Sequence, residues 1–547
     1  MITRRTLIST AAAPALLSGA PARRPNVIVI MTDDQGYGDL SLHGNPHLKT
    51  PNLDRIGREG VQFSRFHCSP VCSPTRASLM TGRYNYRTGV VDTYLGRSMM
   101  HPDEVTLPEC LRLAGYRTGI FGKWHLGDNY PMRAMDQGFT ETLTMRGGGL
   151  AQPSSPPGTG YFNPPLEHDG RPLNGRGYCT DIFFDAAQGF IEQNRKNPFF
   201  AYIPCNAPHT PLEIGDEWVA PYRGTGLDEM TAKIYGMIAN VDHNTGRLLD
   251  RLRELELERD TLVVFLTDNG PQQRRFNANL RGLKGSVYEG GIRVPCFLRW
   301  PGHIGAGTTD SRISAHIDLM PTILDACGVA LPQLPVGRGI DGMSLLKPAK
   351  ERSLLFQWHR GDVPQPFRNC AVLTDRWKLI GTDKQTPELY DLQADPAESH
   401  DLAAQQPQLT AWLRGYYEAW FWDVARDHGY APPRIALGTR HENPVLLTRQ
   451  DWRGPAASWD ATGVGHYEVD VRTAGNFQVT LRFPALAAAG TAEVEFGASL
   501  WKMPVAVGAS EAVFEKVPLP SGPGRIEGRL SSGGLTLGAH YMQVLHR

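Results

Sequence analysis

The residues best suited to chemistry in this sequence surround Cys72, in the run Cys72-Ser73-Pro74-Thr75-Arg76. Proline has no amide hydrogen to lose and its φ suits the first turn of a helix, so Pro74 predicts a helix start. A residue just before that turn faces unpaired N–H groups and the positive end of the helix dipole, which stabilise an anion. Arg76 can add a charge-assisted contact to the same anion. Taken alone, Cys72 is more simply explained as a buried thiol or a disulfide partner of Cys68.

Two pairs of oxygen-bearing side chains, Asp33-Asp34 and Asp268-Asn269, offer ligands for a metal. Carboxylate and amide oxygens are the hard ligands that Ca²⁺ prefers, with Mg²⁺ an alternative if the cavity is tight. The structural alternative is a helix cap at Asp33-Asp34 and a turn at Asp268-Asn269-Gly270. Either pair alone leaves the choice open, whereas both pairs together favour a metal.

Two lysines and two histidines extend the set of candidates. In Gly122-Lys123-Trp124-His125-Leu126-Gly127, an extended segment projects Lys123 and His125 to the same side. One face then carries a cation and a base. His209 and Lys284 stand apart, and as isolated residues they are more often hydrogen-bonded or solvated side chains than catalysts.

Most of these groups closely follow apolar runs that predict strands, at residues 26–31, 117–121, 199–203 and 262–266. Between them lie amphipathic helical stretches, such as residues 230–255 with apolar residues at three- and four-residue steps. This alternation is typical of βαβ units, so we expect an α/β fold with a large, mainly parallel sheet covered by helices. Ligand sites in such sheets lie beyond the carboxyl ends of the strands. The groups that follow the strands, at Asp33-Asp34, Lys123 with His125, His209, and Asp268-Asn269, should therefore face one crevice.

The motifs also carry a family resemblance. Cys72 begins the pattern CxPxR, the TGR element follows at Thr81-Gly82-Arg83, and further matching motifs extend to Lys284. On these motifs the chain resembles the type I, formylglycine-dependent sulfatases of the arylsulfatase and glycosaminoglycan-sulfatase kind, within the alkaline phosphatase superfamily. Cys68 begins a similar triplet, but its fifth position is a cysteine and not an arginine.

The resemblance implies that a formylglycine-generating enzyme oxidises Cys72 and that the hydrated aldehyde attacks sulfur. It also implies a role for each candidate: metal ligation by Asp33, Asp34, Cys72, Asp268 and Asn269; sulfate binding by Arg76, Lys123 and Lys284; assistance to the leaving oxygen by His209 and Lys284; and general base catalysis by His125. Two alternatives stay open: a phosphodiester or phosphonate monoester hydrolase of the same superfamily, and an unmodified protein that binds sulfated glycans.

The substrate is expected to be a sulfated carbohydrate or an aryl sulfate, since these motifs hold the sulfate and not the remainder. Trp358, His359 and Arg360 follow an apolar run and are candidates for the alcohol-side subsite, although an exposed loop is the simpler interpretation. In the tail, Trp452, Trp459 and Tyr467 are better explained by core packing than by stacking on sugars.

We expect four segments: an export signal at 1–22, a catalytic domain at 23–360, a small antiparallel subdomain at 361–430 and a β-sandwich at 431–547. The first combines a basic start, an apolar stretch and an AxA-like site, and its Arg4-Arg5 resembles a twin-arginine signal. The mature protein should be periplasmic or extracellular. No later segment reaches the ~20 apolar residues of a membrane span.

The composition excludes some partners and a disulfide scaffold. Lys plus Arg number 56 and Asp plus Glu number 56, so the chain has no net positive charge that would attract nucleic acid or an anionic membrane. Eight cysteines in 547 residues, none in a CxxC pair, predict few or no structural disulfides.

Overall fold

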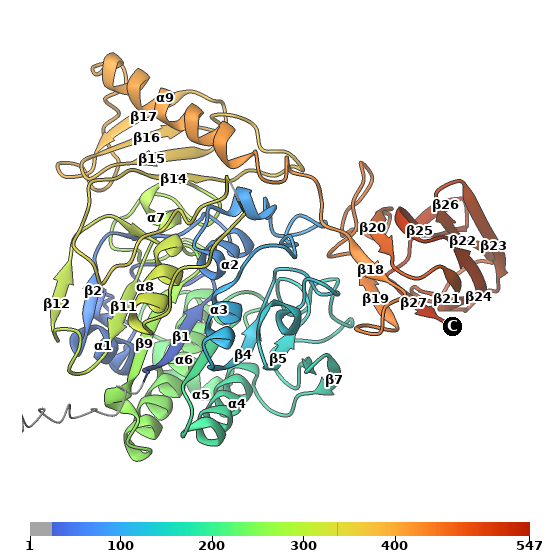
Figure 1. Cartoon of the computed structure of the whole chain (residues 1–547), viewed down its shortest axis with the longest axis horizontal. Helices are drawn as coiled ribbons and strands as arrows, with labels where there is room; N and C mark the ends of the chain where they lie inside the picture. The colour runs from blue at the N-terminus through green and yellow to red at the C-terminus, as the bar shows by residue number, and fades with distance from the viewer. Residues whose placement is uncertain (1–23, 336) are drawn as a thin grey trace, which may run out of the picture.

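The computed structural model describes residues 24–335 and 337–547, so the predicted export signal lies outside the described residues. Figure 1 shows an α/β unit, a small sheet with helix α9 above it, and a β-sandwich at its side. In the part of the chain that the structure describes, no helix combines the length and apolar character needed to cross a bilayer.

A ten-stranded mixed sheet forms the centre of the α/β unit. Its order is β12 (Thr308–Asp310), β2 (Val61–Phe63), β11 (Cys296–Arg299), β9 (Thr261–Thr267), β1 (Asn26–Thr32), β8 (Phe199–Pro204), β4 (Arg117–Lys123), β5 (Glu141–Met145), β6 (Pro165–His168) and β7 (Arg171–Asn174). The central strands β9, β1, β8, β4 and β5 are parallel. The four predicted strands are among them, and the α/β fold prediction is confirmed.

Alternate residues of β1 enter two separate cores, which explains its continuous apolar run. Val27, Val29 and Met31 face one core, and Ile28 and Ile30 face the other. The first core is covered by α2 (Cys72–Thr81), α3 (Leu107–Leu113) and α8 (Leu319–Ala326); the second by α1 (Pro51–Arg58), α4 (Cys179–Asn194) and α6 (Glu229–Glu254). The short helices α5 (Asp216–Val219) and α7 (Glu289–Ile292) and a small sheet of β10 (Arg293–Val294), β3 (Phe66–His67) and β13 (Ser314–Ala315) complete the unit. Helix α6 coincides with the predicted amphipathic helix.

The second unit is an antiparallel sheet against which α9 (Pro407–Val424) packs. Its strands are β14 (Leu354–Gln357), β15 (Cys370–Leu373), β16 (Trp377–Gly381) and β17 (Pro387–Asp391). Because β14 pairs with β15, this unit begins before the predicted boundary between residues 360 and 361. The fully buried β14 shows no alternation of apolar and polar residues that would separate it from the preceding domain.

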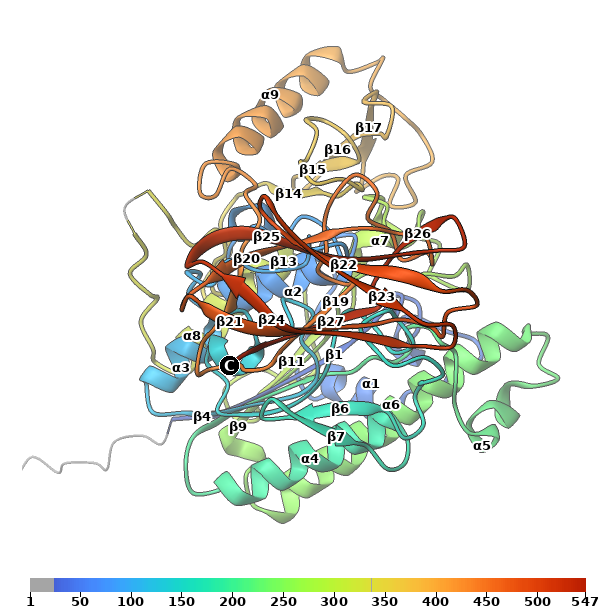
Figure 2. The ribbon, with the colours of Figure 1, turned by 90° about the vertical axis from the view of Figure 1, so that its right-hand side faces the viewer.

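Two sheets form the C-terminal β-sandwich, which faces the viewer in Figure 2. One holds β18 (Ile435–Leu437), β20 (His466–Val471), β25 (Gly522–Ser532), β22 (Gly490–Phe496) and β23 (Ser499–Val505), with β26 (Leu535–Gly538) on β25; the other holds β19 (Val445–Thr448), β27 (Tyr541–His546), β21 (Gly475–Arg482) and β24 (Glu511–Leu519). The core between the sheets also includes Leu95, Met99 and Met132 of the α/β unit. The sandwich is therefore packed onto that unit through apolar side chains.

All eight cysteines lie in the described part of the chain, and each is a buried free thiol. They come from strands, helices and loops of the first two units, and the sandwich contains none. The packing of these units is therefore maintained without covalent cross-links between the cysteines.

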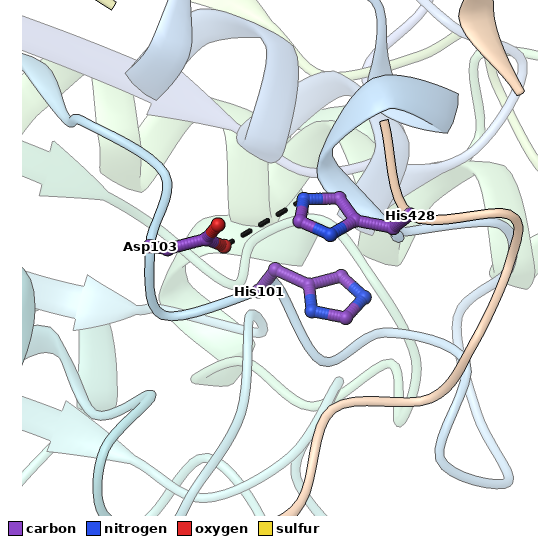
Figure 3. A group of neighbouring side chains, drawn as sticks. All are labelled: His101, Asp103 and His428. Carbon is purple, nitrogen blue, oxygen red and sulfur yellow. Dashed lines mark ion pairs between the residues drawn. The ribbon is translucent and has the colours of Figure 1, made fainter. Parts of the chain in front are cut away.

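Two histidines stack where the chain leaves α9 and contacts the α/β unit (Figure 3). The ring centroids of His101 and His428 are 3.7 Å apart, with an interplanar angle of 7°. His428 Nε2 lies 3.6 Å from Asp103 Oδ1 and 3.3 Å from Glu104 Oε1. The lone pairs of stacked rings lie in nearly parallel planes and do not converge on one tetrahedral ion. We therefore interpret this cluster as a contact between segments.

The stacked pair predicts a stability that depends on pH. Burial, together with His428, lowers the pKa of His101 from 6.5 to about 4. The unfolded chain therefore binds more protons than the folded one between these values, and stability is lost as pH falls from about 6.5 to about 4. His101→Gln should flatten this dependence by roughly 1–2 kcal/mol, measured as urea unfolding midpoints across that range. If stability falls equally steeply with pH in the wild type and in His101→Gln, the pH dependence does not come from His101.

Candidate active site

The candidate metal ligands meet at the carboxyl ends of two neighbouring strands. Strands β1 and β9 pair in register to their last residues, so Asp33-Asp34 and Asp268-Asn269 emerge side by side. The Asp268 amide donates to the Thr32 carbonyl at 3.1 Å, and the Asp34 amide donates to Asp268 Oδ1 at 3.3 Å. All four side chains are buried. The sheet thus gathers the two pairs in one place, as its parallel strands require.

Two lysines face these carboxylates. Lys123 Nζ lies 2.5 Å from Asp33 Oδ2, and Lys284 Nζ lies 2.6 Å from Asp34 Oδ1. Burial alone would raise the pKa of Asp33, but the Lys123 ammonium and other nearby cations hold that pKa well below its usual value. Burial alone would lower the pKa of Lys284, but Asp34 raises it. Asp33 is therefore ionised and Lys284 protonated at neutral pH.

Arg76 is buried and holds the carboxylates together. Its guanidinium donates to Asp268 Oδ2 at 2.7 Å, to Asp33 Oδ2 at 3.4 Å and to the Lys123 carbonyl at 2.9 Å. Burial and the charge of Asp33 nevertheless raise the pKa of Asp268 to about 6. We predicted a direct contact between Arg76 and a bound anion, whereas in this structure the guanidinium pairs with the carboxylates and Arg76 does not line the pocket next to Cys72. The reason is that α2 starts before Pro74, so Arg76 lies a full turn into the helix.

Cys72 is the first residue of α2, two positions before the start that Pro74 predicted. Pro74 still occupies a place where an amide hydrogen would lack a partner, because the Thr75 amide donates the first intrahelical bond, at 3.5 Å. Cys72 Sγ is 3.8 Å from Asp33 Oδ1, and the residue is 2% exposed. Burial raises the pKa of the thiol to about 12. Unmodified, Cys72 is thus a protonated thiol and a poor nucleophile.

The two histidines each use one ring nitrogen to bind a backbone carbonyl. His125 Nε2 lies 2.7 Å from the Thr93 carbonyl, and His209 Nδ1 lies 2.7 Å from the Thr210 carbonyl. Since a carbonyl only accepts, these nitrogens carry the hydrogens. His125 Nδ1 is buried without a hydrogen-bond partner among the described residues. Burial lowers the pKa of both rings, so each presents an unprotonated nitrogen.

The donor set fits a hard divalent cation. Asp34 Oδ2 and Asn269 Oδ1 are buried and have no hydrogen-bond partner among the described residues, although Asn269 Nδ2 donates to Asp34 Oδ1 at 2.7 Å. Asp33, Cys72 and Asp268 place ligand atoms within 4.8 Å of one another. Orphaned buried oxygens are destabilising, and a cation would satisfy them. The chemistry of these residues therefore supports the predicted metal site.

Four of these predicted site residues open onto a pocket of about 1000 Å³, and the others lie behind its lining. Cys72, His125, His209 and Lys284 line it, as do Trp358 and Arg360 from the candidate subsite. His359 is not one of the lining residues. Its Nδ1 donates to the Arg360 carbonyl at 2.9 Å and its Nε2 accepts from the Gln365 amide at 2.7 Å. The prediction for His359 was therefore wrong, because the ring is buried within its own loop.

Comparison with known proteins identifies the family. Residues 25–329, more than half of the chain, match the family model described as Sulfatase. The chain belongs to the sulfatase family. Residues 283–414 of this sulfatase also match the model for the C-terminal region of N-sulphoglucosamine sulphohydrolase. It is thus a sulfuric ester hydrolase, and sulfatases generally use formylglycine and a divalent metal.

Individual sulfatases agree with this assignment. Human N-acetylgalactosamine-6-sulfatase is 32% identical over 375 residues, covering 63% of this chain and 70% of that protein. Human arylsulfatase A is 31% identical over 451 residues, covering 71% of this chain and 85% of that protein. The crystal structure of Ps i-CgsB has a TM-score of 0.68 and 30% identity, covering 74% of this chain and 94% of that one. Phosphonate monoester hydrolase of Agrobacterium radiobacter, 21% identical with a TM-score of 0.54, shares the fold.

Much of the pocket wall of this sulfatase was not foreseen. Tyr94 and Gln152 come from loops of the α/β unit, Lys384 from the turn between β16 and β17, and Trp459 from the β-sandwich. Trp459 was assigned to the core, and it does pack, partly buried, against the sandwich core, but it also lines the pocket. In contrast, Trp452 and Tyr467 are indeed core residues, at 1% and 2% exposure. No local pattern distinguishes these aromatic residues, because tertiary contacts decide which one reaches the pocket.

Gln450, also from the sandwich, was missed entirely. Its Nε2 donates to the Thr93 carbonyl at 2.9 Å, the same oxygen that accepts from His125, and to Ser98 Oγ at 3.1 Å. Gln450 is thus a positioning residue for His125.

Gln450→Leu should lower the kcat of this sulfatase about 10-fold with little change in KM, because a loosened His125 is a poorer base. Water entry would relieve the burial that lowers the pKa of His125, so the acidic limb of the kcat–pH profile should move to higher pH. Gln543→Leu, on the partly exposed face of β27, is the matched control. An unchanged pH profile would show that Gln450 is only structural.

Proposed function

We propose that this sulfatase removes sulfate from a sulfated carbohydrate, using formylglycine made from Cys72 and a bound Ca²⁺. The observation that carries the proposal is the position of Cys72 at the pocket floor, 3.8 Å from Asp33 and beside Lys284, His125 and His209. The aromatic and charged pocket wall supports a carbohydrate, whose hydroxyl-rich, often anionic units suit such surfaces.

The metal would be held by Asp33, Asp34, Asp268 and Asn269 together with residue 72. When bound, it would withdraw charge from the sulfate oxygens and lower the pKa of the hydrated aldehyde. A set of three carboxylates and an amide oxygen, with no histidine among these ligands, favours Ca²⁺ over a softer transition metal.

Each step of the reaction is then assigned to a residue of the chain. Lys123 and Lys284 neutralise the sulfate oxygens, while one hydroxyl of residue 72 attacks sulfur in line with the departing alcohol. Lys284, which is protonated, gives a proton to the leaving oxygen, and His209 lines the same pocket. His125, through its unpaired Nδ1, accepts the proton of the second hydroxyl, so that the bond from the Cβ atom of residue 72 to the sulfate oxygen breaks, sulfate departs with that oxygen and the aldehyde returns. The C–O bond of the substrate stays intact.

A panel of sulfated mono- and oligosaccharides, with formylglycine occupancy measured on the same sample, tests this proposal. Desulfation that scales with occupancy is expected. Paired aryl sulfate and aryl phosphate esters separate sulfatase from phosphohydrolase activity. Binding of sulfated glycans without turnover in a fully modified sample would refute the proposal.

We also propose that the protein is exported, by the twin-arginine route, to the periplasm or beyond. The Arg4-Arg5 pair, the apolar stretch and the AxA-like site support this. A formylglycine-generating enzyme is then the required partner, and it would act before export. Replacement of Arg4 and Arg5 by lysine should leave the protein in the cytoplasm, as shown by cell fractionation.

A further inference from the structure

The β-sandwich contributes a side chain to the pocket that contains Cys72. Trp459 lies on the segment between β19 and β20 and lines this pocket while only partly buried. Its ring meets that of Tyr94 edge-on, with centroids 5.2 Å apart at 80°. This segment belongs to neither matched family region, since both end before β18.

Trp459 continues a wall of alternating aromatic and cationic side chains. The Arg360 guanidinium lies 4.4 Å from the centroid of Tyr94 and 5.0 Å from that of Trp358. Buried Asp92 fixes the side chains of Arg360 and Trp358, because it accepts a hydrogen bond from Arg360 at 2.7 Å and one from Trp358 Nε1 at 3.0 Å. The wall is thus built jointly by the α/β unit, the loop after β14 and the sandwich.

Hydrogen bonds from residues near Trp459 fix the sandwich against the α/β unit. The Gly96 amide donates to the Gln450 carbonyl at 2.9 Å, and Arg453 donates to the Gly96 carbonyl at 2.8 Å. Arg453 also donates to Asp362 at 2.7 Å, which links the sandwich to the loop that carries Arg360. An aromatic ring on a segment anchored in this way loses little conformational entropy on binding a ligand.

The chemistry of the wall identifies its ligand. Aromatic faces offer apolar surface to the C–H face of a pyranose, and the Arg360 side chain, 53% exposed, keeps donors for a sulfate or carboxylate. The pocket volume of about 1000 Å³ is at the upper end for small-molecule sites, which leaves space beyond the sulfated unit.

We propose that the β-sandwich completes the substrate site, with Trp459, Tyr94 and Arg360 binding a second, anionic saccharide unit next to the one that loses sulfate. The inference rests on the proposed function and narrows its substrate to an anionic oligosaccharide of at least two units. The sandwich is thus part of the active site and not a separate carbohydrate-binding module.

The test compares two substrates in the full-length, modified enzyme: 4-nitrophenyl sulfate and the sulfated tetrasaccharide that the wild type turns over fastest. Trp459→Ala should lower the ratio of kcat/KM for the tetrasaccharide to that for the aryl sulfate about 10- to 100-fold, mainly through KM. Trp459→Phe should lower this ratio less than Trp459→Ala does. Trp412→Ala, at a tryptophan 61% exposed on α9, is the matched control and should leave the ratio unchanged.

Three outcomes would overturn the inference: an unchanged ratio in Trp459→Ala, an equal fall in both rates, or a wild type that prefers monosaccharides. Thermal unfolding of each variant identifies misfolding, and the Phe variant then provides the comparison. Calorimetric binding of the tetrasaccharide to Cys72→Ala, with and without Trp459→Ala, separates the two proposals. Trp459-dependent binding without any sulfatase turnover in the modified wild type would refute the proposed function alone.

Discussion

Cys72→Ser should lose multiple turnover, with steady-state activity at least about 1000-fold below that of the wild type. A serine ester of sulfate lacks the second hydroxyl through which His125 could expel sulfate, so an unoxidised serine enzyme stops after one event. The buried, protonated thiol of unmodified Cys72 should be no better as a nucleophile. Aryl sulfate turnover, followed from the first seconds, distinguishes a single event from a steady rate.

Mass spectrometry of the peptide that contains Cys72 completes this experiment, because conversion to formylglycine lowers the mass by ~18 Da. Cys68→Ser is the matched control, since Cys68 begins the same Cys-Ser-Pro triplet and is equally buried. It should retain activity. Sustained turnover by Cys72→Ser with no oxidised peptide would rule out the assigned nucleophile.

Removal of the metal should have the second-largest effect. Chelation is expected to lower turnover at least about 100-fold, and Ca²⁺ should restore it. The melting temperature should also fall, since a cation bound only by the folded state stabilises it, and since Asp33 and Asp268 then face each other without the added charge. Calorimetric unfolding with and without Ca²⁺ gives a readout that does not depend on activity.

Two substitutions locate the metal. Asp34→Asn preserves shape but removes a charge, so Ca²⁺ affinity should fall at least about 10-fold. Asp103→Asn is the control, because Asp103 belongs to the stacked histidine cluster, which could be mistaken for a metal site. Loss of Ca²⁺-induced stabilisation in Asp103→Asn, with none in Asp34→Asn, would place the metal at the wrong cluster.

The site floor could be predicted from the sequence because local signals determine it. Strand β1 is apolar at every position from Val27 to Met31 since both faces of the sheet are covered, and Asp33 and Asp34 follow its last residue. Strands β9, β8 and β4 carry the same signal, and parallel pairing brings their polar ends together. Strand order was not needed, because every arrangement of parallel neighbours leaves these ends at one edge.

Features that depend on small shifts or distant contacts could not be predicted. The start of α2 two residues before Pro74 turns Arg76 from the pocket toward Asp268. Trp459 reaches Tyr94 across more than three hundred residues of sequence. His359, flanked by two lining residues, is turned into its loop by the Gln365 amide. A shifted helix start, a contact between units and a hydrogen bond within a loop thus decide the directions of these three side chains.

The buried, unpaired cysteines make the folded state independent of the redox poise of its surroundings. A fold without disulfides can form in a reducing cytoplasm, and thiols closed to solvent are slow to react with oxidants in an oxidising compartment. Such a protein can complete its fold on one side of a membrane and operate on the other. Cys72 differs in that it lies at the floor of the pocket, but it is only 2% exposed, so we expect a modifying enzyme to reach it more readily before the fold closes around it.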